Sequence, residues 1–312
     1  MIETPLPKDF ICGIQGVKPS PYRQLLFEKD RFGLPSLQIS TLMPTSSGGY
    51  CLYENSTFHL LLFDRELHFT TKSQLPVSMR TAQSGYSLAE FQGLFYCADF
   101  ISGQIAVLRP DASIDRVLDV RDRLSPMSMT ANGNRLFVSG IHPDGHDIQV
   151  LRLGKDGKGW EPVLTDLYLD MFKGKTETLW ARNALVPFGR DGLMLGFQFG
   201  NTLIQINTAG EILNWQLMDA FYPRFEEDQD GAVFPAGYAA TAFSEGPGQT
   251  LLIATCDQVR RVCSRVLQMN ASLDRVISEW EAPFHLWQIK YFPHLQLLAF
   301  LGPGQVVFYK TE

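Results

Sequence analysis

The side chains best suited to chemistry in this chain are one imidazole and one guanidinium, those of His285 and Arg182. An imidazole takes up or releases a proton near neutral pH, so His285 is the preferred catalytic acid or base. The guanidinium of Arg182 stays charged and can hold a carboxylate or polarise a carbonyl group. A structural alternative stays open, because either side chain can bind a loop carbonyl or pair with Glu177 or Glu226. We predict that His285 and Arg182 are catalytic.

Aromatic, thioether and amide side chains recur where we expect the first strand of a sheet to begin. They have the composition of a pocket for a small molecule with a hydrophobic surface. The alternative is that the aromatic rings only fill space between the sheets. The predicted substrate-binding residues are Tyr86, Met127, Asn183, Tyr238, Phe284 and Trp287.

The turn at residues 140–147 carries two histidines and two aspartates, which are standard metal ligands. His142 and His146 would share one face only in a helix, and Pro143 with Gly145 makes this segment a turn. A solvated turn is therefore preferred to a metal site. We expect no metal and no cofactor.

A repeated hairpin indicates which elements position these residues. An alternating apolar run, a tight polar turn and a second such run recur, with steps of 47, 45, 54 and 62 residues between Asp64, Asp111, Asp156, Gly210 and Ser272. This spacing is typical of four-stranded blades in a β-propeller. The predicted blades span residues 37–71, 84–119, 127–164, 183–217 and 238–280.

The last blade lacks one strand when it is read from the C-terminal residues alone. Residues 285–309 supply three strands, and residues 22–27 form an alternating run with no partner near the start of the chain. Pairing them would cover both loose edges. We therefore predict an all-β, six-bladed β-propeller, closed by one N-terminal and three C-terminal strands, as a single domain over residues 1–312.

Two long connections suggest where the site lies. In a propeller, links between successive blades emerge at the same edge as the turns between second and third strands. The links 165–182 and 218–237 should therefore border one channel mouth, and loops on a rigid scaffold commonly carry function.

Composition excludes several classes of protein. The net charge of -6 without a basic stripe argues against nucleic-acid binding. No run approaches the about 18 apolar residues of a membrane span, so we expect no membrane partner. Five irregularly spaced cysteines fit free thiols in a reducing compartment, which predicts a cytoplasmic protein.

The blade count, the closing run Tyr22–Phe27 and the turn Thr208–Ile212 resemble the six-bladed propeller superfamily of gluconolactonase-like and strictosidine synthase-like proteins. The lactonase branch implies a divalent ion held by acidic and amide side chains, of which only Asn183 is matched here. The strictosidine synthase-like branch implies one acidic residue in an apolar pocket, and Glu177 or Asp99 is the candidate.

Three functions follow from these features. The first is a metal-independent enzyme that promotes proton-assisted cyclisation, condensation, isomerisation or lactone opening of a hydrophobic small molecule. The second is a non-catalytic scaffold that binds a protein partner through residues 218–237, with anchors at Phe221, Tyr222, Phe225 and Phe234. The third is a calcium-dependent lactone hydrolase.

Overall fold

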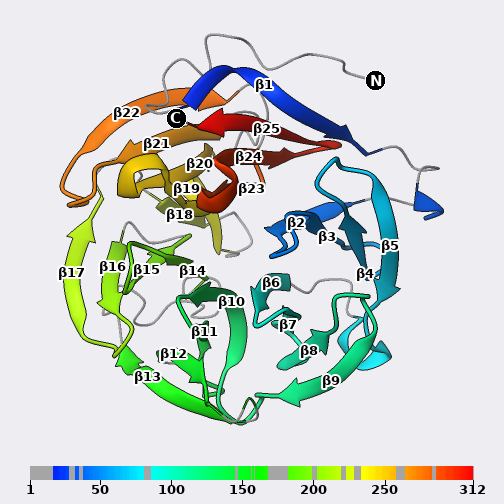
Figure 1. Ribbon diagram of the computed structural model, residues 1–312. Coiled ribbons are helices and arrows are strands. Elements are labelled where there is room, and N and C mark those ends of the chain that lie inside the picture. Colours follow the sequence, from blue (N-terminus) through cyan, green and yellow to red (C-terminus); the bar gives the residue numbers. More distant parts are fainter. Residues whose placement is uncertain are drawn as a thin grey trace. The chain divides into compact units, whose positions relative to one another are not determined.

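The strands of the computed structural model form six antiparallel sheets, which are the blades of a six-bladed β-propeller (Figure 1). The prediction of an all-β propeller with six blades is confirmed. The residues that the structure describes are 17–27, 32–34, 38–80, 86–144, 147–155, 157, 159–167, 182–198, 202–218, 223–227, 233–257, 264–282 and 286–311.

The larger of two compact units, residues 27–215, contains blades 1 to 4 apart from the last two residues of blade 4. Blade 1 consists of β2 (Ile39–Pro44), β3 (Tyr50–Glu54), β4 (His59–Phe63) and β5 (Phe69–Gln74). Blade 2 consists of β6 (Tyr86–Phe91), β7 (Leu94–Asp99), β8 (Gln104–Leu108) and β9 (Ile114–Asp119). Blade 3 consists of β10 (Ser125–Asn132), β11 (Arg135–Ile141), β12 (Ile148–Leu153) and β13 (Trp160–Leu167). Blade 4 consists of β14 (Asn183–Pro187), β15 (Gly192–Phe197), β16 (Thr202–Asn207) and β17 (Ile212–Leu217).

The smaller unit joins residues 1–26 to residues 216–312 and contains blades 5 and 6. Blade 5 consists of β18 (Pro223–Glu227), β19 (Val233–Gly246), β20 (Thr250–Asp257), β21 (Ser264–Met269) and β22 (Val276–Ala282). Blade 6 consists of β23 (Gln288–Phe292), β24 (Leu297–Gly302), β25 (Gln305–Thr311) and β1 (Val17–Leu26). The short 3₁₀ helices are η2 (Val77–Met79), η4 (Pro247–Gln249) and η5 (Pro293–Leu295).

Blade 6 is completed by the N-terminal strand, as predicted. β1 runs antiparallel to β25, with Arg23 opposite Phe308 and Leu25 opposite Val306, and the two strands lie side by side in Figure 1. The Lys310 ammonium lies 4.4 Å from the ring centroid of Tyr22, a cation–π contact between the same strands. Hydrogen bonds and side-chain contacts thus join the two ends of the chain.

Blade 5 differs from the prediction. Residues 218–237 were expected to form a long connection, but Pro223–Glu227 pairs with the first residues of β19 and adds a fifth strand to the sheet. Tyr238, expected at the start of a first strand, lies six positions into β19 when counted from Val233.

Continuous apolar runs form the second strands because these are covered on both faces. Every residue of β15 and of β24 is buried. Neighbouring blades pack through apolar side chains, as in the cluster between blades 2 and 3 that includes Val107, Val138 and Leu151. This packing fixes the turns at the ends of the strands.

Hydroxyl groups link the first strands of neighbouring blades. The Met129 amide donates a hydrogen bond to Ser87 Oγ (2.8 Å), the Leu185 amide to Ser128 Oγ (3.0 Å), and in the smaller unit the Tyr291 amide to Ser244 Oγ (3.0 Å). First strands are sheet edges, so their outward amides need partners other than a neighbouring strand. The serines supply these partners.

Candidate functional site

Two predicted binding residues meet where the first strands of blades 3 and 4 begin. Asn183 is buried at the start of β14, and its Nδ2 donates to the sulfur of Met127 at 3.4 Å. Its Oδ1 accepts a 2.6 Å hydrogen bond from the Ser139 hydroxyl. Asn183 therefore joins two blades, and its amide belongs to the wall between them.

Arg182 stands immediately before Asn183, and its side chain is exposed. Its carbonyl accepts a 2.9 Å hydrogen bond from the Gln198 amide, which fixes the backbone beside the second strand of blade 4. A cation on a fixed backbone, at the open end of a first strand, is suited to holding an anionic or carbonyl oxygen.

The remaining predicted residues of the larger unit lie in blade 2. Tyr86 begins β6 and is paired with Asp99 across the sheet. Asp99 is fully buried, and it accepts hydrogen bonds from the amides of Ile101 and Ser102, both at 3.2 Å. Burial raises the pKa of the Asp99 carboxyl. The acid suggested by the strictosidine synthase-like resemblance is thus part of a tight turn, whereas Glu177 lies outside the described residues.

In the smaller unit, Trp287 lies just before β23 and keeps 36% of its surface exposed. Its amide donates to the Leu301 carbonyl at 2.9 Å, which places its backbone beside the second strand of blade 6. Tyr238 is paired with Asp257 in β19. His285 and Phe284 lie outside the described residues, so their roles stay predictions.

Lys290, which is not among the predicted site residues, lies on β23 after Trp287. Burial lowers the pKa of its ammonium group. The signal was present in the sequence, since the lysine stands between the apolar residues Ile289 and Tyr291 of the run 288–292. It places an amine of reduced basicity on the first strand of blade 6.

The histidine-rich turn after β11 is partly described. His142 Nδ1 lies 2.6 Å from Asp144 Oδ1, and the His142 amide donates to the Asp147 carbonyl at 2.7 Å. This is a hydrogen-bonded turn, and His146 is outside the described residues. In the described part of the chain, no three His, Cys, Asp or Glu side chains are grouped to hold a metal ion. In that part there is also no helix with the length and apolarity to cross a membrane.

No protein-family model matches the chain, and no curated protein sequence matches it. Solved structures do. A streptogramin B lyase superposes with a TM-score of 0.59 at 14% identity, over 90% of this chain and 81% of that one. A catalytically inactive His-to-Ala variant of Staphylococcus aureus virginiamycin B lyase, with quinupristin, gives 0.59 at 9% identity, over 93% and 99%. The propeller domain of Cps50 (Swd1) from Myceliophteria thermophila gives 0.56 at 10% identity, over 93% and 100%.

These neighbours include lyases and a domain of another kind, at identities that establish only a common fold. The likeness confirms the propeller. The reaction and substrate have to be argued from the side chains.

Proposed function

We propose that this chain is a small-molecule-binding β-propeller and a metal-independent enzyme that promotes proton-assisted cyclisation, condensation, isomerisation or lactone opening of a hydrophobic substrate. His285 would move the proton, and Arg182 would hold an anionic or carbonyl oxygen of the substrate. Tyr86, Met127, Asn183, Tyr238, Phe284 and Trp287 would shape the binding surface. Such an enzyme works largely by holding a reactive conformer.

One observation supports this proposal above the others. Met127 and Asn183 come from different blades and meet at 3.4 Å where their first strands begin, with exposed Arg182 next to them. Buried Asn183 thus holds the half-buried Met127 beside the exposed Arg182, although the sequence places Met127 and Asn183 56 positions apart. The lyases among the structural neighbours show that propellers of this fold include enzymes.

The test is turnover of a panel of hydrophobic lactones and cyclic esters, including a streptogramin B antibiotic, followed by mass spectrometry. Hydrolytic opening adds one water to the substrate mass, whereas elimination or isomerisation leaves the mass unchanged. We expect His285→Ala to lower turnover by about 10²-fold, the usual contribution of a general acid or base, and Arg182→Ala to weaken it less.

The matched controls are His294→Ala and Arg190→Ala, which remove the same groups from exposed positions. Both should retain activity, as should wild-type protein treated with a chelator. Equal turnover by His285→Ala and His294→Ala would remove His285 from the mechanism. Loss of activity on chelation would favour the calcium-dependent hydrolase.

A protein-binding scaffold is the second candidate, and the outer strand of blade 4 favours it. Ile212, Leu213 and Trp215 on β17 are exposed at 45%, 56% and 43%. The strand Ile212–Leu217 contains no charge and no proline, the usual protections of an open edge. It leads directly into residues 218–237, where the sequence analysis placed a partner site.

The scaffold hypothesis predicts a protein that copurifies with the full chain and is lost on Trp215→Lys. Val77→Lys is the control, because Val77 is exposed at 77% in η2, the link between blades 1 and 2. Retention of the partner by Trp215→Lys would exclude β17 as its site.

A further inference from the structure

A groove between blades 2 and 3 lies at the opposite ends of the strands from Met127 and Asn183. It has a volume of about 770 Å³, within the range of small-molecule pockets. It is formed by the turn after β6, by β9 and by the turns after β10 and β12. Its lining residues are Phe91, Gln92, Leu94, Tyr96, Arg116, Asn134, Arg135, Arg152, Leu153, Gly154, Lys155 and Gly157.

The lining is positively charged. Among the lining residues that the structure describes are Arg116, Arg135, Arg152 and Lys155, and none of those described is a carboxylate. Arg152 is neutralised by Glu161 on the next strand. Asp115 is shared, because one oxygen pairs with Arg116 and the other with Arg109, both at 2.6 Å. One carboxylate between two guanidinium groups leaves a positive charge uncompensated.

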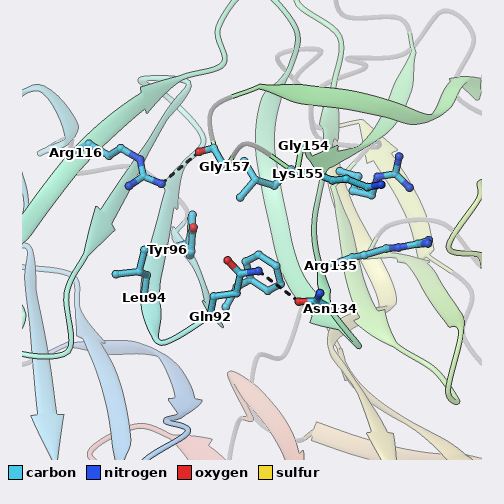
Figure 2. Close-up of a pocket in the computed structure, with 12 residues that line it drawn as sticks. Gln92, Leu94, Tyr96, Arg116, Asn134, Arg135, Gly154, Lys155 and Gly157 are labelled. Atoms are coloured by element: carbon cyan, nitrogen blue, oxygen red, sulfur yellow. Dashed lines mark hydrogen bonds between the residues drawn. The ribbon is translucent and has the colours of Figure 1, made fainter.

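Arg116 is the cation that points into the groove. Figure 2 shows its side chain reaching toward Gly157 on the opposite wall, where Nη2 donates to the carbonyl at 3.3 Å. That hydrogen bond is long, so an anionic oxygen would be a better acceptor. The Nε of Arg116 is buried and has no hydrogen-bond partner. The group that faces the groove is therefore Nη2, whose long bond to the Gly157 carbonyl a phosphate oxygen can replace.

The other cations border the groove. Arg135 is exposed and donates to the Thr208 carbonyl at 3.3 Å, so its head points away from Arg116 in Figure 2. Lys155 is exposed on the turn after β12. Both charges raise the positive potential near Arg116 without filling the space beside it.

The rest of the lining suits the organic part of a ligand. Phe91, Leu94 and Leu153 provide apolar surface, and the phenol of Tyr96 lies beside them. The amide of Gln92 donates to Asn134 Oδ1 at 3.4 Å, a weak contact that a polar ligand group can replace. A cation beside an apolar surface in one groove selects an amphipathic anion.

We propose that this groove binds a small organic phosphate, with the phosphate on Arg116 and the organic part against Phe91, Leu94 and Leu153. A planar guanidinium matches the geometry of a phosphate group, and the volume is sufficient for a molecule of mononucleotide size. Within the larger unit, the groove lies at the other ends of the strands from Met127, Arg182 and Asn183.

The experiment is calorimetric titration of the full chain at low ionic strength with AMP, adenosine and citrate. AMP should bind at one site and adenosine, which lacks the phosphate, at least about tenfold more weakly. Arg116→Gln should reduce AMP affinity by about tenfold or more, and Lys155→Gln by a smaller factor. Lys155 is exposed, so its variant tests the site even if Arg116→Gln perturbs folding.

The matched control is Arg65→Gln, since Arg65 occupies the third-to-fourth-strand turn of blade 1 as Lys155 does in blade 3. It borders a groove that also contains Asp64, Glu66 and Glu90. AMP affinity should be unchanged in this variant. Equal weakening by Arg65→Gln and Lys155→Gln, binding of citrate but not AMP, or no binding of AMP at millimolar concentration would each overturn the proposal.

Discussion

The turns after the second strands of blades 1 and 2 differ in how many hydrogen bonds they make to a buried carboxylate. Each begins with a fully buried carboxylate, Glu54 at the end of β3 and Asp99 at the end of β7. Glu54 accepts hydrogen bonds from the amides of Gln38 (2.9 Å), Ser56 (2.9 Å) and Thr57 (2.7 Å), and from the Ser56 and Thr57 hydroxyls. The amide hydrogen bonds to the Asp99 carboxylate, from Ile101 and Ser102, are both longer, at 3.2 Å.

The difference in hydrogen bonding gives the two carboxyls opposite pKa shifts. Burial alone would raise the pKa of Glu54, but hydrogen bonds from Ser56, Thr57 and Gln38 bring it below its ordinary value. Burial raises the pKa of Asp99, and its fewer hydrogen bonds offset this only in part. Equivalent positions in a repeat thus hold a stabilised anion in one blade and a carboxyl that favours its proton in the next.

Of the changes to these two turns, removing the Glu54 carboxylate is expected to lower the free energy of unfolding most. Glu54→Ala removes the acceptor of three amides and two hydroxyls in partly buried hydrogen bonds, which should lower the free energy of unfolding by about 3 kcal/mol. Urea denaturation measures the change. Glu66→Ala, in an exposed turn of the same blade, is the control and should change it by less than about 0.5 kcal/mol. A similar small change for Glu54→Ala would show that its hydrogen bonds do not stabilise blade 1.

Asp99→Asn is expected to have a smaller effect, and its sign depends on pH. A folded-state pKa above the unfolded value means that the carboxyl stabilises the fold below about pH 3.9 and loses this contribution as pH rises through the folded pKa. Asparagine mimics the protonated carboxyl at every pH. The free energy of unfolding of Asp99→Asn minus that of wild type should therefore be larger at pH 7 than near pH 3.5.

Glu54→Gln is the matched comparison for that pH dependence. Its parent carboxyl has a lowered folded pKa, so wild-type stability from Glu54 is present above about pH 4.3 and is lost as pH falls. The disadvantage of Glu54→Gln should then shrink on acidification. The same trend for both variants would contradict the opposite pKa shifts.

The fold could be predicted because burial imposes a period on the sequence. Runs such as Leu193–Gly196 and Leu251–Ala254 became second strands, and the unpaired run from Tyr22 became the fourth strand of blade 6. Gly210 also fits its predicted turn: its φ is +95°, and a Cβ there would meet the Val163 carbonyl oxygen at 1.8 Å. β18 was missed because Glu226 and Glu227 interrupt the apolar pattern.

The sites were harder to predict because they depend on which blades are neighbours. The Met127–Asn183 contact could be expected once the first strands of neighbouring blades were placed side by side. The groove at Arg116 combines turns from two blades, and the repeat spacing does not indicate which turn residues meet there. Glu54 left a local signal, since Ser56 and Thr57 follow it within three positions. The stabilising effect of Glu54 depends on its complete burial, which the amino-acid sequence alone does not indicate.

The smallest expected effect concerns the hydroxyl groups around these carboxylates. Ser56 Oγ donates to buried Glu54, so Ser56→Ala should lower the free energy of unfolding by about 1 kcal/mol. Ser113→Ala is the control, because Ser113 Oγ donates to Asp111 at 2.6 Å in an exposed turn of blade 2. There water can replace the lost donor, and the change should stay below about 0.5 kcal/mol. Urea denaturation of both variants would thus separate the effect of burial from that of the hydrogen bond, and equal losses would mean that burial does not strengthen the Glu54 cluster.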